Sequence, residues 1–429
     1  MLTLTKEQEA ALQHVKDGHS VCICGPAGCG KSTLLHHIRM YAATKDIAYS
    51  VTAMTGCAAL LVGGRTVHSY LAIGRADRDI ENMVAFTRKV RPLYKRLNEL
   101  EMLIIDEISM AHGGLIDYIS EYLQRVRGDV RPFGGIQMVF IGDFAQLPPV
   151  INKTSKTGNQ SQEFSFAFDA KEWKRLAPKV IVLNQILRQA GDATFAEMLG
   201  RFRRGDCTPD DLVTLNECKS RTFAPSQRPT RLFALNADVD RINTNEFEAL
   251  LQRTGVERVI LPTAYLGRKE VSKKWADSCD IPEHVQVAVG AHVVVTANVN
   301  PEAGVVNGTQ AIVASCGGGR LALQLQNGTV YNMLPHLVKD SESAAAVAYY
   351  PIKLAYALSI HKCQGMTLDA IEIDLGSSIF VWGQAYTALS RARSLDTVRI
   401  LDVKARSFRT HPKVIEFYQA ASANSTHHN

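Results

Sequence analysis

A glycine-rich loop near the N-terminus constrains the fold of this chain more than any other feature. Residues 25–32 read GPAGCGKS and fit the pattern G-x-x-x-x-G-K-[ST]. The apolar run 20–24 before the loop predicts a strand, and residues 32–41 after it predict a helix. In that context the loop amides bind phosphates, Lys31 reaches the β- and γ-phosphates, and Ser32 binds Mg²⁺. The alternative interpretation is a plain glycine turn between a strand and a helix.

Two adjacent carboxylates follow a second apolar run. Residues 102–105 predict a strand, and Asp106 and Glu107 come directly after it. In an enzyme with a phosphate-binding loop, the first acid holds Mg²⁺ and the second can activate water. Two acids after a strand are equally common in a plain loop. Their occurrence together with the glycine loop favours a catalytic pair.

Two glutamines have competing interpretations. Gln146 follows the apolar run 138–141 and a polar turn, so it could sense the γ-phosphate or simply precede the prolines that end the turn. Gln8 stands three residues after Thr5, which is the spacing of a capping box at a helix N-terminus. The amide of Gln8 could instead recognise adenine. The local sequence leaves both questions open.

Two arginines could complete a phosphoryl-transfer site. Arg188 lies in Leu-Arg-Gln and Arg391 in Ser-Arg-Ala, both far from the glycine loop in sequence. A lone arginine is normally a surface residue. An arginine across a cleft from the nucleotide would instead stabilise charge on the transferring phosphoryl group.

The distribution of apolar runs predicts an α/β domain that is split by a β-rich insertion. Strand-like runs alternate with helical stretches up to about residue 258, which predicts a parallel sheet covered by helices. Short β-rich runs separated by Asn and Gly over 258–350 predict a small antiparallel unit. The alternation returns over 352–403. Residues 152–162 indicate a polar loop, and 419–429 a frayed tail.

Composition narrows the class of protein. Of the 429 residues, 46% are hydrophobic and 21% are charged, which excludes a disordered, collagen-like or coiled-coil chain. No uncharged run is long and apolar enough to span a bilayer, so we expect no membrane segment. The nine cysteines include no C-x-x-C pair, which predicts a reducing intracellular compartment, either nucleus or cytoplasm. The first 20 residues carry acids and lack an apolar core, so we expect no secretory or evident mitochondrial targeting segment.

Positive charge and aromatic residues suggest a polyanionic partner without proving one. The net charge is +6, and residues 65–96 hold eight basic side chains against three acids. Such a run is either a solvated face or a surface for a polyanion. Tyr70, Phe133 and Phe144 could stack on nucleic-acid bases, although an aromatic residue beside a strand more often belongs to the core.

The order of these motifs resembles the Pif (petite integration frequency) DNA helicases, in the RecD-like branch of helicase superfamily one. The matching segments run from residue 4 to about 403 and cover nearly the whole chain. They are LTKEQEAAL at 4–12, GPAGCGKST at 25–33, TAMTGCAA at 52–59, GGRTVHSYLAIG at 63–74, LIIDEISM at 103–110, FGGIQMVFIGDFAQLPPV at 133–150, LNQILRQ at 183–189, TRLFALNADVDRIN at 230–243, GVVNGTQAIV at 304–313, LAYALSIHKCQGMTLD at 354–369 and GQAYTALSRARSLD at 383–396.

The resemblance implies an α/β fold of two RecA-like parallel-sheet lobes with ATP between them. The first lobe would be residues 1–180, with a strand-separating wedge inserted at about 62–98. The second lobe would be 181–258 and 351–410, interrupted by a small SH3-like β-barrel at 259–350. Residues 411–429 would form a C-terminal tail.

The resemblance also implies an ATP-dependent helicase that moves 5′ to 3′ on single-stranded DNA and unwinds tailed or forked duplex DNA as a monomer, with ATP and Mg²⁺ as cofactors. Two alternatives remain open at this level. One is a single-strand-stimulated ATPase and translocase that remodels protein–DNA complexes without productive unwinding. The other is a passive single-strand binding module with a vestigial ATP site.

The family's functional residues carry over by position. The implied ATP-binding residues are Gln8, Gly25, Gly28, Gly30, Lys31, Ser32, Thr33, Gly365 and Arg391. Asp106 and Ser32 would hold Mg²⁺. The implied catalytic roles are phosphate binding by Lys31, water activation by Glu107, γ-phosphate sensing by Gln146, and arginine fingers at Arg188 and Arg391. The DNA path would be lined by Thr55, His68, Ser69, His361 and Lys362.

Two cysteines depart from the family pattern. Cys29 stands where the family often has Thr, and we expect little effect because the loop acts through its backbone. Cys363 stands where Ser is common. Because a thiol is a weak hydrogen-bond donor, this change puts one presumed DNA contact in doubt.

Overall fold

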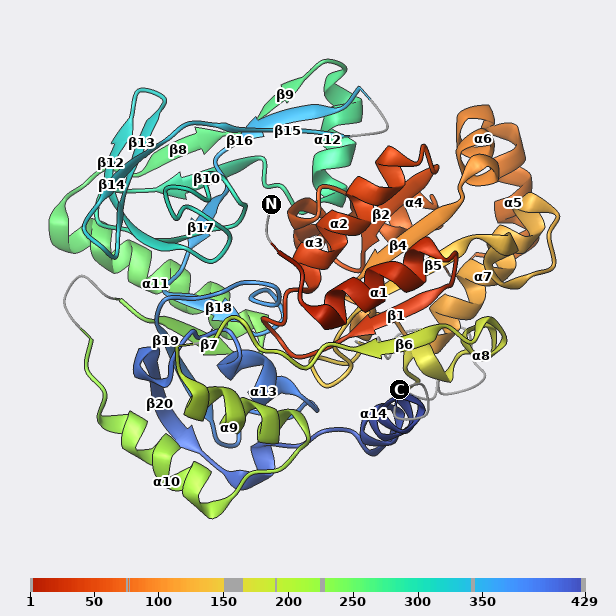
Figure 1. Cartoon of the computed structure of the whole chain (residues 1–429). Helices are drawn as coiled ribbons and strands as arrows, with labels where there is room; N and C mark the ends of the chain where they lie inside the picture. The colour runs from red at the N-terminus through yellow and green to blue at the C-terminus, as the bar shows by residue number, and fades with distance from the viewer. Residues whose placement is uncertain are drawn as a thin grey trace. The chain divides into compact units, whose positions relative to one another are not determined.

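The computed structural model of the chain divides into two compact units (Figure 1). The first unit is Met1–Leu187 together with His411–Asn429, and the second is Arg188–Thr410. The structure describes residues 3–74, 76, 78–149, 165–189, 191–223, 228–340 and 344–425. The predicted polar loop at 152–162 and the basic residue Arg75 lie outside these ranges. Among the described helices, none is both long and apolar enough to cross a membrane.

A six-stranded parallel sheet forms the centre of the first unit. Its order is β3-β2-β4-β5-β1-β6, and every neighbouring pair is parallel. The strands are β1 (Val21–Cys24), β2 (Tyr49–Ala53), β3 (Arg65–Thr66), β4 (Met102–Asp106), β5 (Gln137–Gly142) and β6 (Lys179–Val182). This confirms the predicted parallel sheet. Strands β1, β4 and β5 are mainly apolar and buried, because both faces of the sheet are covered at these positions.

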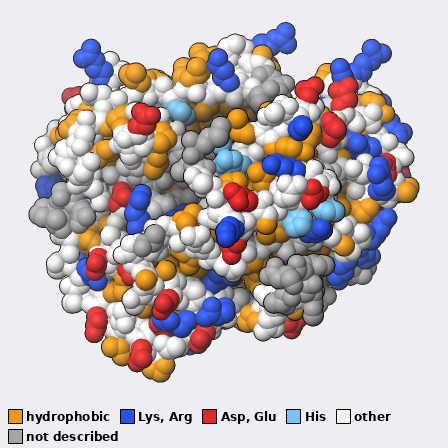
Figure 2. All heavy atoms as spheres, in the orientation of Figure 1, with side chains coloured by type: hydrophobic (Ala, Val, Ile, Leu, Met, Phe, Trp, Pro, Cys, Tyr) orange, Lys and Arg blue, Asp and Glu red, His pale blue; other side chains and the backbone are white. Residues whose placement is uncertain are grey.

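Helices connect these strands and cover the sheet. They are α1 (Lys6–Lys16), α2 (Lys31–Thr44), α3 (Gly56–Leu61), α4 (Val67–Tyr70), α5 (Ile80–Lys89), α6 (Arg91–Glu99), α7 (Gly113–Arg127) and α8 (Lys171–Leu176). Figure 1 shows α5, α6 and α7 side by side at one margin of the unit, where they pack against one another. In Figure 2, Lys and Arg side chains are numerous along this margin.

The predicted frayed tail is wrong over most of its length. Residues Pro412–Ser425 form helix α14, which belongs to the first unit. Phe417 stacks on Phe168 with ring centroids 4.6 Å apart and meets the edge of Phe144 at 5.1 Å. The Tyr418 hydroxyl donates to Asp143 Oδ1 at 2.9 Å. Helix α14 is therefore held by tertiary contacts that partly bury Phe417 and Tyr418, and local sequence does not reveal such contacts.

The second unit contains a four-stranded parallel sheet in the order β18-β7-β19-β20. Its strands are β7 (Thr230–Phe233), β18 (Ala357–Ser359), β19 (Ile371–Leu375) and β20 (Val398–Val403). The accompanying helices are α9 (Ala193–Arg203), α10 (Pro209–Glu217), α11 (Asn236–Thr254) and α13 (Gln384–Leu389). Between β7 and β18 the chain leaves this sheet and builds the β-rich insertion.

The insertion consists of three small antiparallel sheets and one helix. A five-stranded sheet, β14-β13-β12-β11-β17, shares one hydrophobic core with the pair β10-β8, and a third sheet, β15-β16-β9, lies beside helix α12. The elements are β8 (Val259–Pro262), β9 (Ala264–Leu266), α12 (Lys269–Ser278), β10 (His284–Val287), β11 (His292–Val295), β12 (Gln310–Gly317), β13 (Arg320–Leu325), β14 (Val330–Met333), β15 (His336–Lys339), β16 (Ala346–Tyr349) and β17 (Ile352–Leu354).

The C-terminal boundary of the insertion differs from the prediction. Strand β17 pairs antiparallel with β11, so Ile352–Leu354 belongs to the insertion and not to the parallel sheet. The parallel sheet resumes only at Ala357. The short run Ile-Lys-Leu fits either kind of sheet, because its sequence does not identify the strand with which it pairs.

Candidate active site

The glycine loop adopts the conformation that a phosphate-binding loop requires. Gly28 and Gly30 have φ of 80° and 81°, in the left-handed region that favours glycine. Space excludes larger residues as well. A Cβ on Gly30 would lie 2.4 Å from Gln8 Nε2, and one on Gly25 would lie 2.6 Å from the Leu183 carbonyl oxygen. The loop follows β1 and ends at the N-terminus of α2, so its amides and the helix dipole favour an anion.

Lys31 lies across this loop. Its ammonium group donates to the carbonyl oxygens of Gly25 and Pro26, both at 2.8 Å, and lies 3.6 Å from Cys29 Sγ. Ser32 is exposed on the first turn of α2, and Thr33 follows it. An ammonium group held by loop carbonyls can exchange these acceptors for phosphate oxygens without leaving the loop.

Asp106 and Glu107 lie at the carboxyl edge of the same sheet. Asp106 ends β4 and accepts a hydrogen bond of 2.9 Å from the Glu107 amide. Glu107 has φ 54°, which is uncommon for a residue with a side chain and occurs often at functional sites. Burial, reinforced by the Glu107 charge, raises the pKa of Asp106 to about 7, although the nearby Lys31 ammonium acts in the opposite direction. A carboxyl group in this environment is stabilised in its charged form by a divalent cation.

Ser32 and Asp106 are chemically suited to Mg²⁺. Both offer oxygen ligands, and the ion takes few protein ligands beside water and phosphate. Burial and the Glu107 charge raise the pKa of Asp106, and the Lys31 ammonium only partly offsets them. A bound Mg²⁺ would supply further positive charge.

Two sets of hydrogen bonds hold the Gln8 side chain. It completes the capping box with Thr5, as predicted, because its Oε1 accepts from the Thr5 amide at 2.9 Å. Its Nε2 donates to the carbonyl oxygens of Cys29 and Gly30 at 3.2 and 3.3 Å. Gln8 is buried. The side chain therefore joins α1 to the phosphate loop, a role that the sequence interpretation missed.

Gln146 lies in a turn that α14 supports. The turn begins at Asp143, whose carbonyl oxygen accepts from the Gln146 amide at 2.9 Å, and both side chains are buried. The Tyr418 hydroxyl bridges Asp143 Oδ1 and the Phe144 amide at 2.9 and 3.1 Å. Tyr418 and Asp143 are thus site-supporting residues that sequence reasoning missed. Only the aromatic pair in an otherwise polar C-terminal segment could have indicated Tyr418.

Three expected DNA-contacting residues follow β2 and β3, at the same edge of the sheet as Asp106. Ala53, the last residue of β2, is level with Asp106, and Thr55 comes two residues later as the N-cap of α3. His68 and Ser69 lie in α4, directly after β3, and are partly buried. Burial, with a smaller effect of neighbouring His112, lowers the pKa of His68. The parallel sheet thus brings Thr55 and His68 to the edge that carries the carboxylates.

The second unit brings Arg188 and Arg391 together. Arg188 Nη1 donates to the Ser390 carbonyl oxygen at 2.9 Å, and Arg391 Nη2 donates to Ser390 Oγ at 2.8 Å. Arg391 is only 1% exposed, and its Nε donates to the Thr387 carbonyl oxygen. The neighbouring Gln189 donates to the Ala392 carbonyl oxygen at 2.7 Å. Two arginines separated by about 200 residues of sequence therefore share one anchor.

The segment after β18 contains the other expected residues of this unit. His361 is partly buried, with a pKa lowered by burial, whereas Lys362 and Gly365 are exposed. Gly365 has φ 80°. Cys363 is fully buried and its thiol donates to the Ile360 carbonyl oxygen at 3.3 Å. In this structure the Cys363 side chain lies in the core.

Comparisons with known proteins agree with this arrangement. The sequence profile of the PIF1-like helicase family matches residues 3–211. The human ATP-dependent DNA helicase PIF1 is 35% identical over 422 residues, which are 97% of this chain and 63% of the human protein. The crystal structure of Pif1 helicase from Candida albicans is 30% identical, with a TM-score of 0.78, over 98% of this chain and 100% of that chain. This chain belongs to the Pif1 helicase family. The family assignment confirms the two RecA-like lobes expected from sequence.

Solved Pif1 structures include complexes with nucleotide and with DNA. Pif1 from a Bacteroides species with ADP-AlF4 is 26% identical, with a TM-score of 0.79, over 99% of this chain and 98% of that chain. Bacteroides Pif1 bound to single-stranded DNA has a TM-score of 0.66. Another structure concerns unwinding at forked duplex DNA by two coordinating Pif1 helicases. The chain spans less than two thirds of the length of human PIF1.

In this Pif1-family chain the three predicted stacking candidates are core residues. Tyr70, Phe133 and Phe144 are each at most 1% exposed, so none of them presents a ring to solvent. The alternative interpretation, that such aromatics belong to the core, is correct. Two exposed aromatics lie instead on α5 and α6: Phe86, 46% exposed, and Tyr94, 36% exposed. Sequence reasoning missed them because they occur inside a charged segment.

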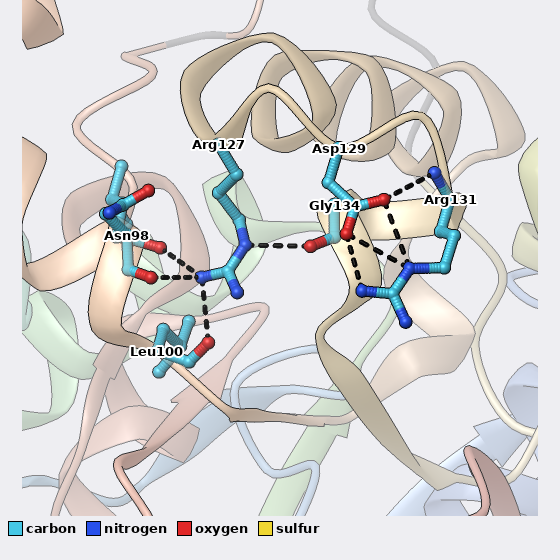
Figure 3. Close-up of polar contacts among 7 residues, drawn as sticks. Asn98, Leu100, Arg127, Asp129, Arg131 and Gly134 are labelled. Atoms are coloured by element: carbon cyan, nitrogen blue, oxygen red, sulfur yellow. Dashed lines mark hydrogen bonds and ion pairs between the residues drawn. The ribbon is translucent and has the colours of Figure 1, made fainter.

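Arg127 fixes α6 to the first unit (Figure 3). Its Nη1 donates to the carbonyl oxygens of Leu97, Asn98 and Leu100 at 2.8 to 2.9 Å, and its Nε donates to that of Gly134 at 2.7 Å. These bonds satisfy carbonyl groups at the end of α6 that the helix itself leaves unpaired. The basic segment is therefore a braced part of the unit.

Proposed function

We propose that this chain is an ATP-driven DNA helicase that moves 5′ to 3′ on single-stranded DNA and unwinds tailed or forked duplexes. The observation that carries the proposal is the convergence of Lys31, Asp106 and Glu107 at one edge of the first sheet, in a chain of the Pif1 helicase family. A phosphate loop with an adjacent carboxylate pair is the minimum that ATP hydrolysis with Mg²⁺ requires.

In this proposal each residue of the first unit has a distinct role. Lys31 and the loop amides hold the phosphates, and Ser32 and Asp106 hold Mg²⁺, which supplies charge neutralisation when bound. Glu107 accepts the proton of the attacking water. Gln146 responds to the γ-phosphate. The left-handed backbone of Glu107 and the bond from its amide to Asp106 Oδ1 support this assignment, because such backbone conformations are common at functional sites.

Arg188 and Arg391 would stabilise the charge on the transferring phosphoryl group. Both guanidinium groups are held by the Ser390 region. A shared anchor supports a joint role, since any movement of Ser390 moves both groups. The two variants Arg188→Lys and Arg391→Lys are therefore expected to lower ATP turnover by similar factors, because lysine does not reproduce the planar fork of arginine.

DNA binding would use Thr55, His68 and Ser69 of the first unit and His361 and Lys362 of the second. Contacts to phosphates supply sequence-independent affinity that falls with salt. The basic margin of α5 and α6 would meet the duplex, with Phe86 and Tyr94 available for base stacking. Their exposure beside the exposed Arg88, Lys89, Arg91 and Lys95 supports this interpretation.

The decisive experiment compares two labelled duplexes, one with a 5′ tail and one with a 3′ tail, in the presence of ATP and Mg²⁺. We expect displacement of the strand from the 5′-tailed duplex alone, at a rate proportional to protein concentration if one chain suffices. Displacement from the 3′-tailed duplex alone would reverse the proposed direction. ATP hydrolysis without displacement from either would leave a translocase in place of a helicase.

A further inference from the structure

The end of α1 brings two histidines together. The Gly18 amide donates to the Val15 carbonyl oxygen and the His19 amide to that of His14, both at 3.1 Å, and Gly18 has φ 79°. This is the Schellman motif, in which the residue two positions after the C-cap lies beside a residue in the last turn of the helix. In most proteins these two residues are apolar. Here they are His19 and His14.

A carboxylate completes the group. Asp17 lies between the two histidines in sequence, and one ligand atom from each of the three side chains lies within 4.8 Å of the others. Gln13 Nε2 donates to Asp17 Oδ1 at 2.8 Å and thereby orients the carboxylate. Figure 2 shows histidine side chains close together on the surface over the end of α1.

The backbone that carries these side chains is fixed from outside the helix. Gln137, at the start of β5, donates through Nε2 to the carbonyl oxygens of Val15 and His19 at 2.9 and 2.8 Å. A ligand set on a backbone that is already held loses little conformational entropy when it binds an ion. The cluster is therefore more than a chance meeting of mobile surface side chains.

We propose that His14, Asp17 and His19 bind a divalent transition-metal ion of the Zn²⁺ class. Two imidazoles and one carboxylate are a known donor set for such ions, with the remaining positions filled by water. Lys179 opposes binding, because its Nζ lies 3.5 Å from His14 Nδ1. The ion would join the end of α1 to the start of β1, at the opposite end of β1 from the phosphate loop. The proposal does not depend on the proposed function.

The test is Zn²⁺ titration of the full chain by calorimetry, in a background variant that carries His427→Gln and His428→Gln, since adjacent histidines near the chain end could bind metal themselves. We expect one ion per chain. His14→Gln, His19→Gln and Asp17→Asn should each weaken binding by about 10-fold or more. Lys179→Gln should strengthen it several-fold, because a positive charge is removed. His36→Gln, which alters an exposed histidine of the same unit, is the matched control and should change nothing.

Co²⁺ spectroscopy identifies the donor atoms independently of affinity. Visible d–d bands without a near-ultraviolet sulfur charge-transfer band are expected, because the ligands are nitrogen and oxygen. Unchanged Zn²⁺ affinity in both His14→Gln and His19→Gln would overturn the proposal, and so would a sulfur band. Circular dichroism spectra identical to the parent's would show that the variants are folded, so a loss of binding would report the site itself.

Discussion

Removal of one hydroxyl group, in Tyr418→Phe, tests whether α14 supports the turn that carries Gln146. The hydroxyl donates to Asp143 Oδ1 and accepts from the Phe144 amide, and Asp143 and Phe144 are at most 1% exposed. Phenylalanine keeps the ring and its packing but leaves a buried carboxyl oxygen and a buried amide each without one bond. Since a lost bond to a buried polar group costs roughly 1–3 kcal/mol and two such bonds are lost, we expect the free energy of unfolding of the first unit to fall by about 2–6 kcal/mol.

The assay is equilibrium urea unfolding of the full chain, compared with the control Tyr41→Phe. The Tyr41 hydroxyl donates to the Lys16 carbonyl oxygen at 3.4 Å in an exposed position, so its removal should change stability by less than about 0.5 kcal/mol. We also expect ATP turnover of Tyr418→Phe to fall while nucleotide affinity is retained, because the loop and Lys31 are untouched. A change in stability no larger than that of Tyr41→Phe would refute the proposed support by α14.

Three further predictions concern Arg127, Asp106 and Gln8. Arg127→Lys should lose most bonds to the carbonyls of α6, destabilise the first unit by roughly 1–3 kcal/mol, and reduce unwinding more than ATP turnover. Arg131→Lys is the control, because the Arg131 guanidinium bonds to the carboxylate of Asp129 instead, and equal effects of the two variants would contradict the interpretation. Asp106→Asn should stabilise the metal-free protein by an amount that grows as pH rises from about 4 to 7 and is constant above pH 7. The reason is that the parent protein loses the stability provided by the protonated Asp106 carboxyl over this pH range, whereas the asparagine does not titrate. Thermal unfolding with and without Mg²⁺ measures the difference, and a pH-independent difference would exclude the raised pKa. Gln8→Ala should weaken binding of ATP and GTP equally if Gln8 only braces the loop, and a selective loss of ATP affinity in equilibrium nucleotide binding would show that it recognises adenine.

Local sequence was sufficient to predict the features that are formed by neighbouring residues in the chain. The phosphate loop, its flanking strand and helix, and the Asp106–Glu107 pair were all predicted, because each depends on neighbouring residues and on the rule that parallel strands end at one edge. The β-rich insertion was visible as a change in period. Its boundary was not, because β17 is defined by its partner β11 and not by its own composition.

Tertiary burial accounts for several further features that local sequence did not reveal. A lone arginine is normally a surface residue, yet Arg391 is buried because carbonyl and hydroxyl oxygens of its own unit accept from its guanidinium group. Cys363 and Phe144 likewise lie in the core. Helix α14 is held because Phe417 and Tyr418 contact Phe144 and Asp143, which lie far earlier in the chain. No short window of sequence contains such information.

Single-strand-stimulated ATP turnover of Glu107→Gln, measured beside the parent protein, tests the central claim most directly. The substitution keeps the size of the side chain and removes the base that accepts the proton from water. The account predicts that turnover falls by about 100-fold or more while a fluorescent ATP analogue still binds. Turnover within a few-fold of the parent, with binding intact, would contradict the assignment of Glu107 and with it the proposed site of hydrolysis.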